Sequence, residues 1–236
     1  KMYALLTVLL SALLWLFHRA CTGGGWWAWA ALPALTWLAV ATHVMAALAV
    51  PLMAVLFVLW WPAARRYGRQ ALLALAAVVV PVFVALPWAL PLLVRGGDIG
   101  HRFRPLPAMA EMMLHAFSRG ILGTWRLLPM SVALFGLLAG TLLPARQPRW
   151  RYVGALWAWM GVPLLGLYFI SLRVPMFLDR YLIWTGPAFY LLAAWGVIQV
   201  WRRVRFVALA WLALSLAWGG GGIWQQSAMP IKSDFR

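Results

Sequence analysis

Acidic side chains are scarce in this sequence, which has 236 residues but only 4 Asp or Glu against 20 Lys or Arg. Charged residues make up 10% of the chain, whereas an ordinary soluble domain has about 25%. Hydrophobic residues make up 65%, and their runs are long enough to cross a hydrocarbon core of about 30 Å. Because one soluble core cannot bury this much apolar surface, the composition predicts an all-α, polytopic transmembrane helical bundle.

Cysteine is nearly absent too. The single Cys21 excludes an internal disulfide and gives no metal or redox motif. Phosphate-binding, serine-hydrolase and zinc-peptidase motifs are also missing from the sequence, so we expect no cofactor and name no metal-binding residues, and the sequence leaves metal dependence undecided. A net charge of +16 in a soluble protein would indicate nucleic acid. Here the basic residues form short clusters between apolar runs, which is typical of cytoplasmic loops, and we expect no nucleic-acid partner.

Eight apolar segments are predicted to form spans. They cover residues 2–17, 26–41, 44–61, 70–94, 127–143, 152–171, 181–200 and 204–219. A single helix over 26–61 would be about 54 Å long, too long for one crossing. The polar pair Thr42-His43 near its middle therefore predicts a tight hairpin there.

The loop charges predict the orientation in the plasma (inner) membrane. Ten arginines and no acid fall on one side: Arg19, Arg65, Arg66, Arg69, Arg146, Arg149, Arg151, Arg202, Arg203 and Arg205. Short basic loops remain in the cytoplasm, so loops 42–44, 95–126 and 172–180 and the C-terminal tail are predicted to face outward. Residues 1–219 would form the transmembrane domain, and 220–236 would begin an outward C-terminal segment.

Two further patterns concern helix packing. In the loop 95–126, residues 107–121 place Met109, Met112, Met113, Ala116 and Phe117 on one helical face, which predicts a helix lying in the membrane interface. The sequence Gly136-Leu-Leu-Ala-Gly140 is a GxxxG motif, which permits close approach of two membrane helices.

The candidate functional residues lie on the predicted outer side. Arg180 follows Asp179 at the start of an apolar helix, where the helix dipole favours an anion rather than a cation. One interpretation is a local ion pair of Asp179 with Arg180 or Arg173. The other is a bound phosphate, held by the guanidinium, by N–H groups of the helix N-terminus and by the Tyr181 hydroxyl.

Other polar residues on this side are also candidates. His43 at the hairpin tip is either a satisfied interfacial residue or a hydrogen-bond donor to a phosphate or sugar. Arg102 and Arg104, beside Asp98, either contact anionic lipid headgroups or line the same cavity as His43.

Four stretches together resemble polyprenyl-phosphate-dependent membrane glycosyltransferases of the C-type fold, such as the bacterial relatives of protein O-mannosyltransferases and aminoarabinose transferases. They are KMYALLTVLLSALLWLFHRA, WLAVATHVMAALAVPLMAVLF, FLDRYLIWTGPAFYLLAAWGV and MPIKSDFR. The resemblance implies transfer of a sugar from a polyprenyl-phosphate donor to a glycan, lipid or protein acceptor at the outer face, among membrane lipids. It implies that Arg180, Tyr181 and Arg173 hold the lipid phosphate and that His43, Arg102 and Arg104 line the cavity.

The chain departs from that family in one respect. Family members carry the catalytic aspartate in the first outward loop, and the corresponding loop here contains only Thr42-His43. We therefore expect an internal fragment that lacks the general base, although Asp98 or Asp179 could replace it. Two alternatives remain at this stage: a ligase or polymerase of lipid-linked glycans, and a transporter, against which the lack of a midplane charge argues.

Overall fold

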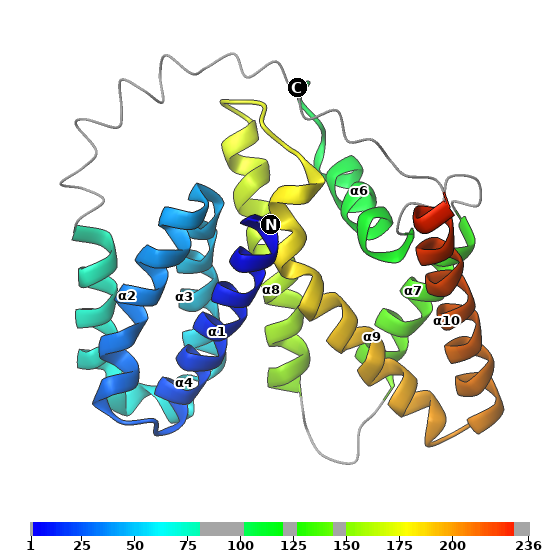
Figure 1. Cartoon of the computed structure of the whole chain (residues 1–236). Coiled ribbons are helices and arrows are strands. Elements are labelled where there is room, and N and C mark those ends of the chain that lie inside the picture. The colour runs from blue at the N-terminus through cyan, green and yellow to red at the C-terminus, as the bar shows by residue number, and fades with distance from the viewer. Residues whose placement is uncertain (1, 81–101, 120–126, 144–149, 229–236) are drawn as a thin grey trace. The chain divides into compact units, whose positions relative to one another are not determined.

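The structure is a computed structural model that describes residues 2–80, 102–119, 127–143 and 150–228. These residues are helical apart from short connections and include no strand, so the all-α prediction is confirmed for them (Figure 1). The helices form two compact units. Unit 1 comprises Lys1–Met109 and Trp157–Pro187, and unit 2 comprises Ala110–Leu156 and Ala188–Arg236.

Unit 1 begins with α1 (Met2–Thr22), whose buried face packs against α2 (Trp26–Thr42) and the 3₁₀-helix η3 (Asp179–Thr185). Leu6, Leu10 and Leu13 are fully buried, and their spacing is that of one helical face. The predicted break at His43 is confirmed, because this residue is extended (φ −161°, ψ 126°) after α2 ends.

After the break the chain of unit 1 turns back past α2 (Figure 1). The elements are η1 (Val44–Leu48, a 3₁₀-helix), α3 (Ala49–Leu59), α4 (Trp61–Ala64), η2 (Arg65–Tyr67, 3₁₀) and a further helical stretch over 68–80.

Unit 2 confirms close packing at the GxxxG motif. Its helices are α7 (Leu127–Leu142), the first part of α8 (Trp150–Ser171), α9 (Gly186–Trp201) from residue 188 onward, and α10 (Arg205–Ala228). A Cβ atom added to Gly196 of α9 would collide with the carbonyl oxygen of Gly136, and one added to Gly140 would lie 2.5 Å from the carbonyl oxygen of Leu192. The backbones of α7 and α9 therefore touch where neither carries a side chain.

The amphipathic helix predicted over 107–121 is α6 (Leu106–Arg119). Its buried residues Met109, Met113 and Phe117 lie on one face, whereas Met112 is half-buried and Ala116 is exposed. In unit 2 the Phe117 ring lies 5.5 Å from that of Phe189. The protein itself thus covers part of the face predicted to meet lipid, and an orientation in the membrane interface stays a prediction.

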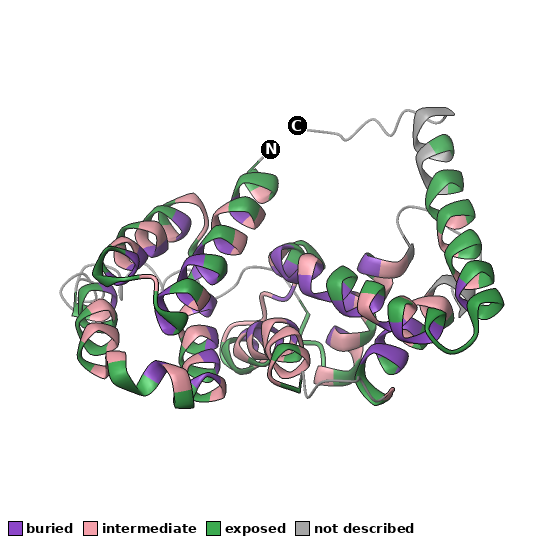
Figure 2. Ribbon diagram, turned by 90° about the horizontal axis from the view of Figure 1, so that it is seen from below, coloured by how far each residue is buried: buried purple, intermediate pink, exposed green. Residues whose placement is uncertain are grey.

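Among the described residues, three helices are long and apolar enough to cross a membrane: Met2–Thr22, Trp150–Ser171 and Asp179–Trp201. Val44–Leu59 and Trp61–Val80 pass the same test together but are bent by 87°, so they give a fourth span if they are counted as one. Figure 2 shows exposed residues along most helices, and large apolar side chains such as Trp26 (77% exposed) and Phe206 (84%) are among them. Such a surface suits a hydrocarbon environment. The division into eight spans and the sides of the loops stay predictions.

Some predicted boundaries are wrong. The segment expected over 204–219 continues as α10 to Ala228, so the run Gly219–Gly222 does not end the helix. The first segment extends to Thr22 rather than residue 17. Residues 81–94 of the predicted segment 70–94 lie outside the described residues. Residues 229–236 of the predicted outward segment do so too.

Candidate functional site

Arg180 lies in a 3₁₀-helix, not at the start of an α-helix as predicted. The α-helix α9 begins only at Gly186, because Pro187 has no N–H and its ring excludes a preceding α-helical turn. The tighter turn closes instead through the Gly186 N–H, which donates to the carbonyl oxygen of Ile183. Arg180 therefore precedes the α-helix by nearly two turns.

This geometry removes the backbone donors expected for a phosphate. The Arg180 N–H donates to Asp179 Oδ1 at 2.8 Å, and the Tyr181 N–H donates to the carbonyl oxygen of Leu178 at 3.0 Å. The side-chain donors that this part of η3 offers an anion are the Arg180 guanidinium and the Tyr181 hydroxyl. An anion at this point would be bound by side chains and not by the helix terminus.

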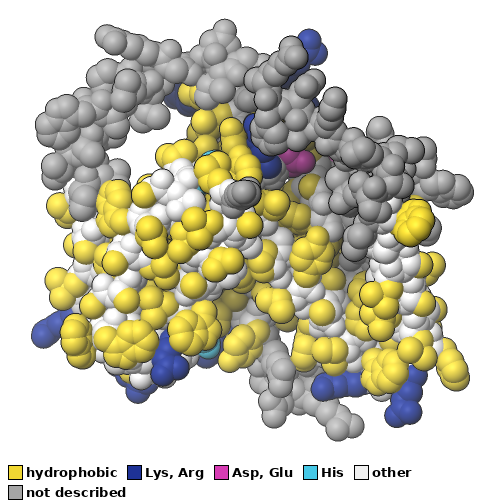
Figure 3. Space-filling model, in the orientation of Figure 1, with side chains coloured by type: hydrophobic (Ala, Val, Ile, Leu, Met, Phe, Trp, Pro, Cys, Tyr) yellow, Lys and Arg dark blue, Asp and Glu magenta, His cyan; other side chains and the backbone are white. Residues whose placement is uncertain are grey.

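The guanidinium of Arg180 has no salt-bridge partner among the described residues. Within the part of the chain that the structure describes, no ion pair joins Asp179 to Arg180 or to Arg173, and all three residues are exposed. On the face in view in Figure 3, basic side chains are more prominent than acidic ones, and a small acidic patch adjoins a basic one. The local ion pair of Asp179 with Arg180 or Arg173 is therefore not formed among the described residues.

His43 lies between two tyrosine rings beside Arg180. Its ring centroid is 5.5 Å from that of Tyr181 and 5.5 Å from that of Tyr3. These contacts join three segments of unit 1 that are far apart in sequence: the first turn of α1, the α2–η1 break and η3. We call Tyr3, His43, Arg180 and Tyr181 the His43 cluster.

The protonation state of His43 follows from its hydrogen bond. The Met45 N–H donates to Nδ1 at 3.2 Å, so that nitrogen is unprotonated and caps η1. Burial lowers the pKa of His43 below its ordinary value of 6.5, and the positive charge of Arg180 lowers this pKa further. Neutral His43 carries its proton on Nε2, which makes it a hydrogen-bond donor without adding a second positive charge.

The other predicted residues are not brought into this cluster. Arg102 and Arg104 are exposed on the stretch before α6, where the Phe103 ring between them lies 6.2 Å from that of Tyr168 on α8. Arg173 follows the end of α8, where its N–H donates to the carbonyl oxygen of Ile170. Asp98 lies outside the described residues.

Tyr3 is the residue that the sequence interpretation missed. The charge pattern could have found it, because a first span whose far end carries Arg19 places residue 3 on the same predicted side as His43 and Arg180. The described residues contain no group of three His, Cys, Asp or Glu side chains placed to hold a metal ion.

The His43 cluster can therefore bind an anionic group that also offers a flat or apolar surface. The guanidinium supplies charge, two hydroxyls and the histidine Nε2–H supply directed hydrogen bonds, and the aromatic rings supply contact area. Comparison with protein-family models, curated proteins and solved structures gives no match.

Proposed function

We propose that this chain is part of a membrane glycosyltransferase that takes a sugar from a polyprenyl-phosphate donor and transfers it to an acceptor. The observation that supports it is the exposed guanidinium of Arg180, which forms no ion pair among the described residues, beside Tyr181 and His43 at one end of an apolar helical unit. A lipid phosphate combines an anionic group with a hydrocarbon chain, and both have a counterpart there.

In this reaction the His43 cluster would stabilise the phosphate that leaves. The acceptor oxygen or nitrogen attacks the anomeric carbon, the bond from that carbon to the phosphate oxygen breaks, and polyprenyl phosphate leaves with the bonding electrons. Negative charge on the phosphate increases during this step. A guanidinium and the neutral donors of the His43 cluster, fixed around the leaving oxygen, would stabilise the transition state more than the bound sugar donor.

The acceptor's proton must pass to a base. Asp179 is the candidate on this chain, because its carboxylate is exposed next to Arg180 in η3. The resemblance to the glycosyltransferases implies a different aspartate, in the first outward loop, where this sequence has only Thr42-His43.

The test separates phosphate binding from other roles. The protein that contains this chain is purified in detergent, and retention of polyprenyl phosphate is compared with that of the uncharged polyprenol by native mass spectrometry. Arg180→Gln should weaken retention of the phosphate ten- to hundredfold, since a charged hydrogen bond contributes roughly 1.5–3 kcal/mol. It should leave the weak retention of polyprenol unchanged.

Arg202→Gln, which removes one exposed arginine from unit 2, is the matched control and should bind like the wild type. Sugar transfer in vesicles should fall by about 10²-fold in Arg180→Gln, as for loss of one donor to a developing oxyanion. Equal retention of polyprenyl phosphate by Arg180→Gln and the wild type would show that Arg180 does not bind the phosphate. Binding without transfer to any acceptor would favour a carrier or transporter.

A further inference from the structure

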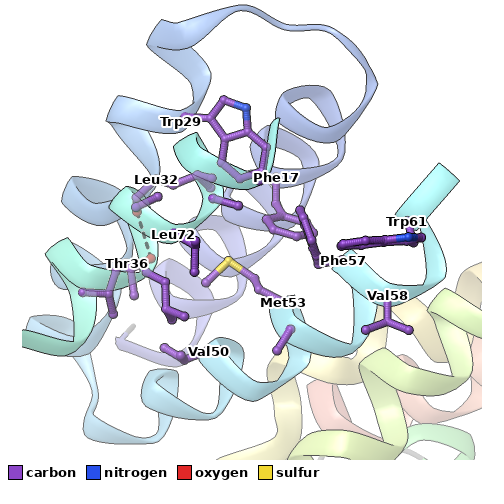
Figure 4. Close-up of a pocket in the computed structure, with 16 residues that line it drawn as sticks. Phe17, Trp29, Leu32, Thr36, Val50, Met53, Phe57, Val58, Trp61 and Leu72 are labelled. Carbon is purple, nitrogen blue, oxygen red and sulfur yellow. Dashed lines mark hydrogen bonds between the residues drawn. The ribbon is translucent and has the colours of Figure 1, made fainter. Parts of the chain in front are cut away.

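Unit 1 contains an apolar groove of about 440 Å³ that is separate from the His43 cluster. Figure 4 shows that residues of α1, α2, α3 and the helical stretch 68–80 point into it. Phe17, Trp29, Met53, Phe57 and Leu72 are among them, and none of the described lining residues is charged.

The groove suits a hydrocarbon chain. The hydroxyl of Thr36, which lines the groove, donates to the carbonyl oxygen of Leu32 on its own helix at 2.8 Å. It therefore needs no hydrogen-bond acceptor from a ligand. The groove opens to the surface, because Val58, Trp61 and Leu72 at its lining are 70%, 52% and 67% exposed. An occupant can thus enter from the side, as an acyl chain does from a bilayer.

One end of the groove is basic. Gly68 lines that end, and the neighbouring residues Arg65, Arg66 and Arg69 are all exposed. Phe17 lines it from α1, whereas Arg19, half a turn later, is exposed on the other side of that helix. The basic residues next to this end of the groove are therefore those around Gly68, namely Arg65, Arg66 and Arg69.

Glycine geometry brings η2 and the end of α1 together. A Cβ atom added to Gly23 would lie 3.6 Å from both Arg66 Nη2 and the Tyr67 hydroxyl, so η2 lies against the α1–α2 turn. Gly23 has φ +118°, which side-chain-bearing residues rarely adopt, so a glycine maintains this approach. Arg66 also stacks over the Tyr67 ring at 4.8 Å, and Arg19 lies over the Trp15 and Trp27 rings at 5.7 and 5.9 Å.

We propose that unit 1 binds one anionic phospholipid, with an acyl chain in the groove and the phosphate at Arg66 and Arg69. Charge complementarity selects an anionic over a zwitterionic lipid, because the described residues place no acid beside these arginines. The aromatic rings that hold Arg19 and Arg66 are of the kind that gathers at headgroup depth. This site is at the far end of α1 from Tyr3, about 20 Å away at 1.5 Å per residue, and it does not depend on sugar transfer.

The test uses nanodiscs with phosphatidylglycerol or phosphatidylcholine, followed by extraction and native mass spectrometry of the lipid that stays bound. We expect phosphatidylglycerol to be retained over phosphatidylcholine, and the double variant Arg66→Gln/Arg69→Gln to weaken its retention by about tenfold or more. The control Arg202→Gln/Arg205→Gln removes the same charge from exposed positions of unit 2 and should retain the lipid. Equal retention of both lipids, or no loss in Arg66→Gln/Arg69→Gln, would overturn the headgroup assignment.

The groove is tested separately. Ala71→Phe places a ring in the lining and should reduce lipid retention while Arg180-dependent binding of polyprenyl phosphate is kept. A phosphatidylglycerol with a photoreactive group on its acyl chain should label residues 50–61 and 68–78. This experiment uses the wild-type protein, so its result does not depend on whether a variant folds. Labelling confined to other helices would show that the chain does not occupy the groove.

Discussion

Replacing Gly196 by alanine should push apart the two helices that meet at the GxxxG motif. The added Cβ would collide with the carbonyl oxygen of Gly136 and lie 2.9 Å from the backbone nitrogen of Gly140. Both obstacles are backbone atoms, so no side chain can rotate away and the helices themselves must separate. Overpacking of a tight contact costs typically 1–3 kcal/mol.

A second glycine isolates this cost from helix propensity. Alanine is favoured over glycine inside a helix by about 1 kcal/mol, which partly offsets the collision at Gly196. At Gly161 of α8 an added Cβ would meet no heavy atom within 4 Å, so Gly161→Ala gains the propensity alone. The difference in unfolding free energy between the two variants is then the packing cost itself, about 1–3 kcal/mol.

Thermal unfolding in one detergent measures this difference. For a chain of this size each kcal/mol shifts Tm by roughly 2–4 °C, so Gly196→Ala should melt several degrees below Gly161→Ala. The double variant Gly140→Ala/Gly196→Ala should lose less Tm than the sum of the losses in the two single variants. Once α7 and α9 have separated to accommodate one added Cβ, the second no longer collides. Equal Tm values for Gly196→Ala and Gly161→Ala would refute close backbone contact between these helices.

Two other predictions concern single hydrogen bonds. His43 has a folded-state pKa below its unfolded value, so its contribution to stability is complete above about pH 6.5 and is lost as the pH falls toward the folded pKa. His43→Asn keeps a capping side chain for the Met45 N–H and should flatten the decrease in Tm between pH 7 and pH 5; an unchanged pH profile would contradict the assignment. Trp211 Nε1 donates to the carbonyl oxygen of Val132 at 2.7 Å, and Trp211→Phe should lower stability by about 1 kcal/mol in the same melting assay. The highly exposed Trp26 provides a control, since Trp26→Phe should leave Tm nearly unchanged, and an equal effect of both would remove the role of that bond.

The sequence alone predicted the helical class, the break at His43 and the close approach at Gly136 and Gly140. These features depend on properties that are local along the chain: hydropathy, the 1.5 Å rise of a helix, and the lack of a side chain on glycine. Local rules also explain an error. Pro187 restricts the turn before it, yet a hydropathy pattern does not distinguish a 3₁₀-helix from an α-helix at Arg180.

Tertiary structure decided which distant residues meet. Tyr3, His43 and Tyr181 are brought together by the packing of α1 against α2 and η3, and no periodicity in the sequence specifies that contact. The same holds for Gly196 as the partner of Gly136, and for an apolar groove whose lining includes Gly68 beside Arg66 and Arg69. Hydropathy shows that a face must be covered, whereas the identity of the covering residue depends on the directions in which helices pack.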